Sequence, residues 1–134
     1  MAGYSGAPLQ KKLGFKEGQT IAILDPPDTF DALLGPLPEG VNLRSSGRGK
    51  VDVVVFFTKE ASALEKRIDA LGRMIFPAGG LWVAWPKRTS KVPTDMSENR
   101  VRDIAIPTGL VDTKVCAIDD IWSGLRLVWR RSHR

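Results

Sequence analysis

The chain is poor in the side chains on which many metal sites and nucleophilic enzymes depend. It has one cysteine, Cys116, and one histidine, His133, which lies in a basic segment next to the last residue. A histidine-based triad or a metal site with several histidines is therefore excluded. Cys116 lies in an apolar segment without a histidine to activate it, so we interpret it as an inert core residue.

Long apolar runs are also missing. No stretch approaches the roughly 18 consecutive apolar residues of a membrane span, and residues 1–14, MAGYSGAPLQKKLG, lack the apolar core of a secretory signal. A lone cysteine cannot form an internal disulfide, so we expect a soluble, cytoplasmic protein with no membrane partner. Its 134 residues and 43% hydrophobic content predict one domain over 1–134.

The most informative unit is a strand, a helix and a second strand over 51–86. The runs VDVVVFFT (51–58) and PAGGLWVAWP (77–86) are apolar without alternation, which is typical of parallel strands covered on both faces. Between them, apolar residues recur every three or four positions, at Ala61, Leu64, Ile68, Leu71 and Ile75. This spacing predicts a helix over 59–76 whose apolar stripe packs on the sheet.

Weaker patterns predict the elements before this unit. The apolar run 21–24 predicts a first strand that ends at Asp25, because the prolines at 26 and 27 supply no N–H to a sheet. Segment 29–38 predicts one or two helical turns, and 41–46 predicts a brief second strand.

After the unit, a polar loop over 86–94 leads to a further helix. Asp95 and Glu98 have capping-box spacing, which predicts a helix from Asp95 to about Ile106. Segments 111–119 and 125–131 predict two strands joined by residues 120–124. So short a connection makes them an antiparallel hairpin.

Together these elements predict an α/β protein with a Rossmann-like three-layer fold, a mostly parallel sheet and an antiparallel C-terminal strand. Ligands of such sheets bind beyond the carboxyl ends of the strands. The polar and aromatic residues at those ends are our candidate ligand-binding residues: Asp25, Thr58, Lys59, Trp85, Lys87, Asp119, Asp120 and Trp122. We predict no catalytic residue and no metal ligand.

Several candidates have a definite chemical role in this hypothesis. Asp25 is suited to a ribose hydroxyl or an amine, and Lys59 and Lys87 to an anion, while Trp85 and Trp122 offer rings for stacking. Structural roles also explain the same residues. Asp25 is suited to initiate a turn and Thr58 to cap the following helix, lysines are usually solvated, and tryptophans often cover a core.

Parts of the sequence resemble known families. The layout resembles that of S-adenosylmethionine-dependent methyltransferases in three parts. The segment LGFKEGQTIAILD (13–25) resembles the one that leads into the first strand of that family, and the unit 51–86 resembles its fourth strand, helix and fifth strand. The terminal hairpin resembles its antiparallel last strand pair. Nearly the whole chain is similar to a family of short bacterial proteins defined only as a domain of unknown function. The stretches that carry this similarity are GYSGAPLQKKLG, GGLWVAWPK, VPTDM and PTGLVDTKVCAIDDIWSGLRLV.

The chain departs from the methyltransferase pattern at its first turn. The cofactor-binding fold normally has a glycine-rich turn there, whereas this chain has Asp25, two prolines and Asp28. We also expect a reduced version of that fold, because the chain is short and leaves little room for a separate substrate-recognition region. We therefore favour a non-catalytic module that uses the strand-end cleft for a small anionic or nucleotide-like ligand or for a protein partner, its cofactor unknown.

Two alternatives remain open. The first is a divergent S-adenosylmethionine-dependent methyltransferase. The second is a nucleic-acid-binding protein, because the chain carries a formal charge of +5 and a basic C-terminus with Arg126, Arg130, Arg131 and Arg134.

Overall fold

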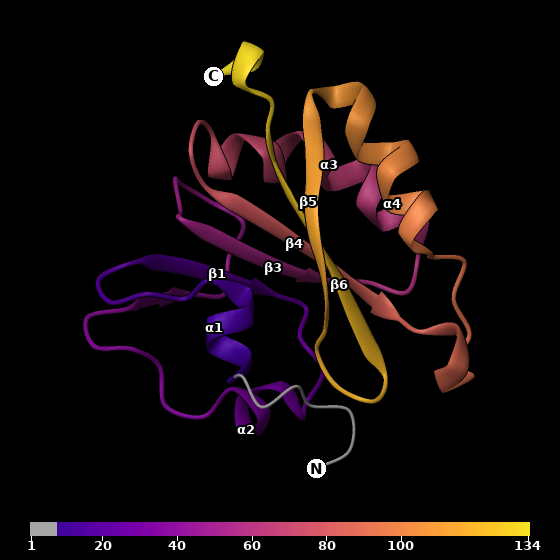
Figure 1. Cartoon of the computed structure of the whole chain (residues 1–134), viewed down its shortest axis with the longest axis horizontal. Helices are drawn as coiled ribbons and strands as arrows, with labels where there is room; N and C mark the ends of the chain where they lie inside the picture. Colours follow the sequence, from indigo (N-terminus) through magenta and orange to yellow (C-terminus); the bar gives the residue numbers. More distant parts are fainter. Residues whose placement is uncertain (1–7) are drawn as a thin grey trace.

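Six strands form one sheet in the order β2-β1-β3-β4-β6-β5 in the computed structural model, which describes residues 8–134 (Figure 1). The strands are β1 (Thr20–Leu24), β2 (Asn42–Arg44), β3 (Val53–Phe57), β4 (Gly80–Pro86), β5 (Leu110–Ala117) and β6 (Trp122–Trp129). The helices are α1 (Leu9–Leu13), α2 (Phe30–Leu34), α3 (Ala61–Ile75) and α4 (Glu98–Ala105), with short 3₁₀ turns at Arg88–Ser90, Ile106–Thr108 and Arg131–His133.

The pairing of the strands confirms the expected fold class. Strands β2, β1, β3 and β4 are parallel, and β6 runs antiparallel between β4 and β5. Every residue of β3 and β4 is buried, which explains why both runs are apolar without alternation. The carboxyl ends of the parallel strands therefore share one edge of the sheet, here called the carboxyl edge, and the opposite edge is called the amino edge.

Helices cover both faces of the sheet. The predicted stripe of α3 is buried, since each of its five residues is at most 5% exposed, and it packs with α4 against one face. On the other face, α1 and α2 contribute Leu13 and Phe30 to a second core cluster that contains Trp82. The α1 helix has only five residues and no repeating stripe, so the sequence did not predict it.

The helix predicted from Asp95 begins three residues later. Helix α4 starts at Glu98, and the hydroxyl oxygen of Ser97 accepts a hydrogen bond from the Arg100 N–H at 3.1 Å. Asp95 instead caps a different helix, because its Oδ1 accepts a hydrogen bond from the Ala61 N–H at 2.7 Å. The prediction that Asp95 caps the helix that follows it was wrong. It caps α3, because its hydrogen-bond partner Ala61 is 34 residues away in sequence.

We expect Asp95→Ala to lower the free energy of unfolding by about 0.5–2 kcal/mol, the usual effect of losing a helix cap. Asp95→Asn keeps an acceptor oxygen and should retain most of that stability. Urea unfolding of the two variants measures the difference. Equal destabilisation by both would contradict a role in capping α3.

The terminal hairpin is also shifted from its prediction. Strand β5 ends at Ala117 and β6 begins at Trp122, so the turn has four residues, 118–121. The Asp119 Oδ1 accepts hydrogen bonds from the N–H groups of Ile121 and Trp122 at 2.8 and 2.7 Å, which closes the turn early. Within residues 8–134, no helix has the length and apolar character to cross a membrane.

Candidate functional site

The carboxyl edge does bring the predicted residues to one side of the sheet, but not into one pocket. Asp25, Thr58 and Lys87 each directly follow a parallel strand, and the β5–β6 turn reaches the same edge through the pairing of Pro86 with Trp122. Residues 8–134 form one pocket beyond β1 and β2 and another beyond β4, and the two have no lining residue in common.

The pocket beyond β1 and β2, here called the β1–β2 pocket, has a volume of about 520 Å³. It is lined by Ile23, Asp25, Pro26, Asp31, Leu43, Arg44 and Ser45. Asp25 has a φ of 55°, in the left-handed region that favours glycine. Non-glycine residues held in this region are concentrated at functional sites.

An ion pair joins the end of β1 to helix α3 at this edge. The Arg67 Nη1 lies 3.4 Å from the Asp25 Oδ2, and the Arg67 guanidinium lies 5.0 Å from the centre of the Phe56 ring. The Asp25 side chain is 70% exposed and that of Arg67 36%, so the pair is weak. The Asp25 carboxylate is therefore accessible to a ligand in the β1–β2 pocket.

The pocket beyond β4, here called the β4 pocket, has a volume of about 660 Å³. Trp85 and Lys87 line it together with the basic residues Arg88 and Lys91. The Lys87 N–H donates a hydrogen bond to the Ile121 carbonyl at 2.7 Å, which joins this loop to the hairpin turn. Of these two predicted residues, Lys87 is partly exposed, whereas Trp85 is buried at 6% exposure.

The other candidates have structural roles or lie outside both pockets. The Thr58 hydroxyl accepts a hydrogen bond from the Glu60 N–H at 3.1 Å and shapes the turn into α3. Lys59 and Asp120 are exposed and line neither pocket. The Trp122 ring is 8% exposed and packs edge-on against Phe57 at 5.2 Å, which makes it a core residue.

The single cysteine and the single histidine line neither pocket at the carboxyl edge. Burial raises the pKa of the Cys116 thiol, which disfavours the thiolate. The His133 ring lies beside Trp129, with the ring centres 6.3 Å apart. The described residues contain no group of three or more potential metal ligands.

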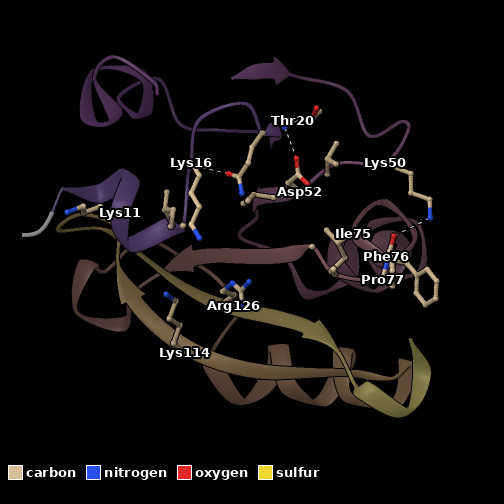
Figure 2. A pocket seen from close by; sticks show the side chains of 17 residues that line it. Lys11, Lys16, Thr20, Lys50, Asp52, Ile75, Phe76, Pro77, Lys114 and Arg126 are labelled. Carbon is tan, nitrogen blue, oxygen red and sulfur yellow. Dashed lines mark hydrogen bonds between the residues drawn. The ribbon is translucent and has the colours of Figure 1, made fainter. Parts of the chain in front are cut away.

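The structure also contains a cleft that our sequence analysis missed. It lies at the amino edge, has a volume of about 720 Å³ and is lined by Lys11, Lys16, Lys50, Lys114 and Arg126 among others (Figure 2). We call it the amino-edge cleft. Arg126 lines this cleft, whereas Arg130 and Arg131 are exposed and are not among its lining residues.

Comparison with solved structures defines the fold. An S-adenosylmethionine-dependent methyltransferase from Aquifex aeolicus is 17% identical with a TM-score of 0.61, over 89% of this chain and 86% of that chain. Magnesium protoporphyrin IX methyltransferase from Synechocystis PCC 6803, with bound SAH, is 11% identical with a TM-score of 0.55, over 91% of this chain and 78% of that one. Aeropyrum pernix fibrillarin, with natively bound S-adenosyl-L-methionine, is 16% identical with a TM-score of 0.52, over 94% and 70%.

The chain therefore has the Rossmann-like fold of S-adenosylmethionine-dependent methyltransferases. At these identities the likeness establishes the fold alone. No protein-family model matches the sequence, and no curated protein matches it significantly. Membership of the domain of unknown function stays a prediction.

Proposed function

We propose that the chain is a divergent methyltransferase that binds S-adenosylmethionine in the β1–β2 pocket. The observation that carries this proposal is the position of the pocket, at the carboxyl ends of β1 and β2 and next to the point where the strand order reverses between β1 and β3. Ligands of open α/β sheets bind at such a point. Aligned structures with bound SAH or S-adenosyl-L-methionine share this fold over most of the chain. Our first preference, a non-catalytic module, has less support from these neighbours.

The lining of the pocket fits an adenosyl ligand. Its volume of about 520 Å³ is within the range of about 300–1,000 Å³ for small-molecule sites. The carboxylates of Asp25 and Asp31 are suited to ribose hydroxyls or to the amine and sulfonium of the ligand. The Leu43 side chain is 50% exposed and offers an apolar surface to the adenine ring. The Arg44 guanidinium is suited to the carboxylate of the ligand.

The first turn retains one property of a glycine-rich turn despite its prolines. Pro26 and Pro27 supply no N–H donors, so the backbone binds the ligand less than in the usual pattern. Asp25 nevertheless adopts the left-handed conformation that glycine favours. In this proposal the main polar contact of the turn is the Asp25 carboxylate. It accepts hydrogen bonds from the ligand, whereas a glycine-rich turn donates them from its backbone.

The β4 pocket is the proposed place of the methyl acceptor. It opens on the same edge of the sheet, and β4 is two strands from β1, a separation of roughly 10 Å. Its lining has three cations, Lys87, Arg88 and Lys91, and two carboxylates, Asp95 and Glu98. Because Glu98 is paired with Arg102, the remaining charge favours an acceptor with negative charge. S-adenosylmethionine supplies an electrophilic methyl group, and the role of the chain is to position the acceptor beside it.

Asp25→Asn should weaken S-adenosylmethionine binding by about tenfold or more, because hydrogen bonds to a charged group contribute about 1.5–3 kcal/mol. Asparagine tolerates the left-handed conformation, so the turn should persist. Isothermal titration calorimetry with S-adenosylmethionine and with S-adenosylhomocysteine measures the affinities.

Asp28→Asn is the matched control, since Asp28 is an exposed carboxylate three residues away that does not line the pocket. It should leave the affinity unchanged. Absence of saturable binding to the unmodified chain would reject the proposal. Binding without any methyl transfer to acceptors would favour the non-catalytic module instead.

A further inference from the structure

The amino-edge cleft is larger than either pocket at the carboxyl edge, and its charge is mostly of one sign. Five cationic side chains and one carboxylate line its volume of about 720 Å³. The carboxylate belongs to Asp52, whose Oδ2 accepts a hydrogen bond from the Thr20 N–H at 2.9 Å. Within residues 8–134, no carboxylate forms an ion pair with Lys16, Lys114 or Arg126. The structure therefore concentrates positive charge there without compensating it.

Two of these cations are held next to each other by the sheet. Lys114 of β5 and Arg126 of β6 are directly opposite in the antiparallel register, so their side chains project from the same face. Like charges in this arrangement destabilise a sheet. The Lys114 Nζ lies 6.0 Å from the centre of the Trp82 ring, and burial lowers the pKa of Arg126. An anion between the two side chains would remove this repulsion.

A glycine makes room for the Arg126 guanidinium at the back of the cleft. A Cβ at Gly80 would lie 2.8 Å from the Arg126 Nε and 2.9 Å from its Nη2, closer than atoms normally approach. Gly80 is in the interior of the sheet, where glycine is unfavourable for a strand. Strand β4 thus lacks a side chain where this guanidinium lies against its backbone.

The two ends of the cleft differ in their suitability for an anion. At one end the Lys50 Nζ donates a hydrogen bond to the Phe76 carbonyl at 3.2 Å, where helix α3 ends. The negative end of the helix dipole disfavours an anion there. At the other end, Figure 2 shows Lys16, Lys114 and Arg126 pointing into the space between the α1–β1 loop and strands β4 and β6.

We propose that the amino-edge cleft binds a small ligand with two or more phosphate groups, held by Lys16, Lys114 and Arg126. Three cations from separate segments suit a ligand with several negative charges better than a ligand with a single carboxylate. Both lysine and arginine bind phosphate. The recessed position of Arg126 and a volume typical of small-molecule sites favour a small ligand over a polymer. This site is independent of the β1–β2 pocket.

The double variant Lys16→Gln/Lys114→Gln tests the site with inorganic tripolyphosphate as the probe, in calorimetry at low salt. Both side chains are exposed, so the variant should fold. We expect saturable binding to the unmodified chain and an affinity at least about tenfold lower in the variant. The control Lys66→Gln/Arg100→Gln removes the same charge from exposed positions on α3 and α4, and should bind as the unmodified chain does.

The outcomes separate this site from non-specific attraction. Equal losses in the two double variants, or no saturable binding of tripolyphosphate, would overturn the proposal. Binding of a single-stranded RNA that tripolyphosphate cannot displace would also overturn it, in favour of a nucleic-acid surface. ATP that binds more tightly than tripolyphosphate would support the site with a nucleotide as the ligand, and equal affinities would support it with a simple polyphosphate.

Gly80→Ala tests the position of Arg126 without changing any charge. The added methyl group displaces the guanidinium, so we expect tripolyphosphate affinity to fall by about tenfold while the circular dichroism spectrum stays that of the folded chain. A folded Gly80→Ala variant with unchanged affinity would show that the recessed guanidinium is not used.

Discussion

Replacing Trp82 with alanine is expected to lower the free energy of unfolding by about 3–5 kcal/mol, the usual effect of removing a large buried ring. Trp82 is 0% exposed and lies in the core cluster beneath α1 and α2. Its Nε1–H donates a hydrogen bond to the Leu13 carbonyl at 2.9 Å, so the ring also holds α1 on the sheet. Urea unfolding followed by circular dichroism measures the change.

Trp82→Phe separates the packing from the hydrogen bond. Phenylalanine keeps most of the apolar contact but leaves the buried Leu13 carbonyl without its donor, for which we expect a loss of about 1–3 kcal/mol. A Trp82→Ala variant that is no less stable than Trp82→Phe would show that the packing of the ring contributes little.

Replacing Trp122 with alanine is expected to cost about 3 kcal/mol of stability and to leave ligand affinity unchanged. The Trp122 ring packs edge-on against Phe57, which in turn packs edge-on against Phe30 at 4.8 Å. This aromatic row joins the hairpin, the centre of the sheet and α2. Thermal unfolding measures the stability, and titration with S-adenosylmethionine below the unfolding transition measures the affinity.

The adjacent Ile121 supplies the control, because its side chain is 41% exposed. Ile121→Ala should change the stability by less than about 0.5 kcal/mol, as surface substitutions usually do. A loss of ligand affinity in folded Trp122→Ala, with little loss of stability, would restore the sequence-based interpretation of this ring as a ligand contact.

The parts of the fold that the sequence predicted best depend on local pattern. The stripe of α3 and the apolar runs of β3 and β4 have a single interpretation, because burial of one helix face or of both sheet faces requires that spacing. The elements it placed poorly depend on distant partners. The Asp95 cap needs Ala61, and the start of β6 at Trp122 needs Pro86 and Phe57.

The site divides in the same way. The position of Asp25 at the carboxyl edge was predictable, since it directly follows an apolar run that the prolines end. Its left-handed backbone and its contact with Arg67 were not, because the two residues are 42 positions apart. The amino-edge cleft left no sequence signal, since its cations are scattered between Lys11 and Arg126 among many other basic residues.

The sequence by itself therefore determined the α/β class, the parallel core of the sheet and the antiparallel hairpin, and with one histidine it leaves no residues for a site with several histidines. These follow from hydrophobic periodicity, connection length and composition, which act over a few neighbouring residues. Only the tertiary structure decided that the carboxyl edge has two pockets, that Trp122 lies in the core, and that Lys16, Lys114 and Arg126 share a cleft. The physical reason is that strand register and helix packing, set by the whole core at once, bring together side chains that no local pattern connects.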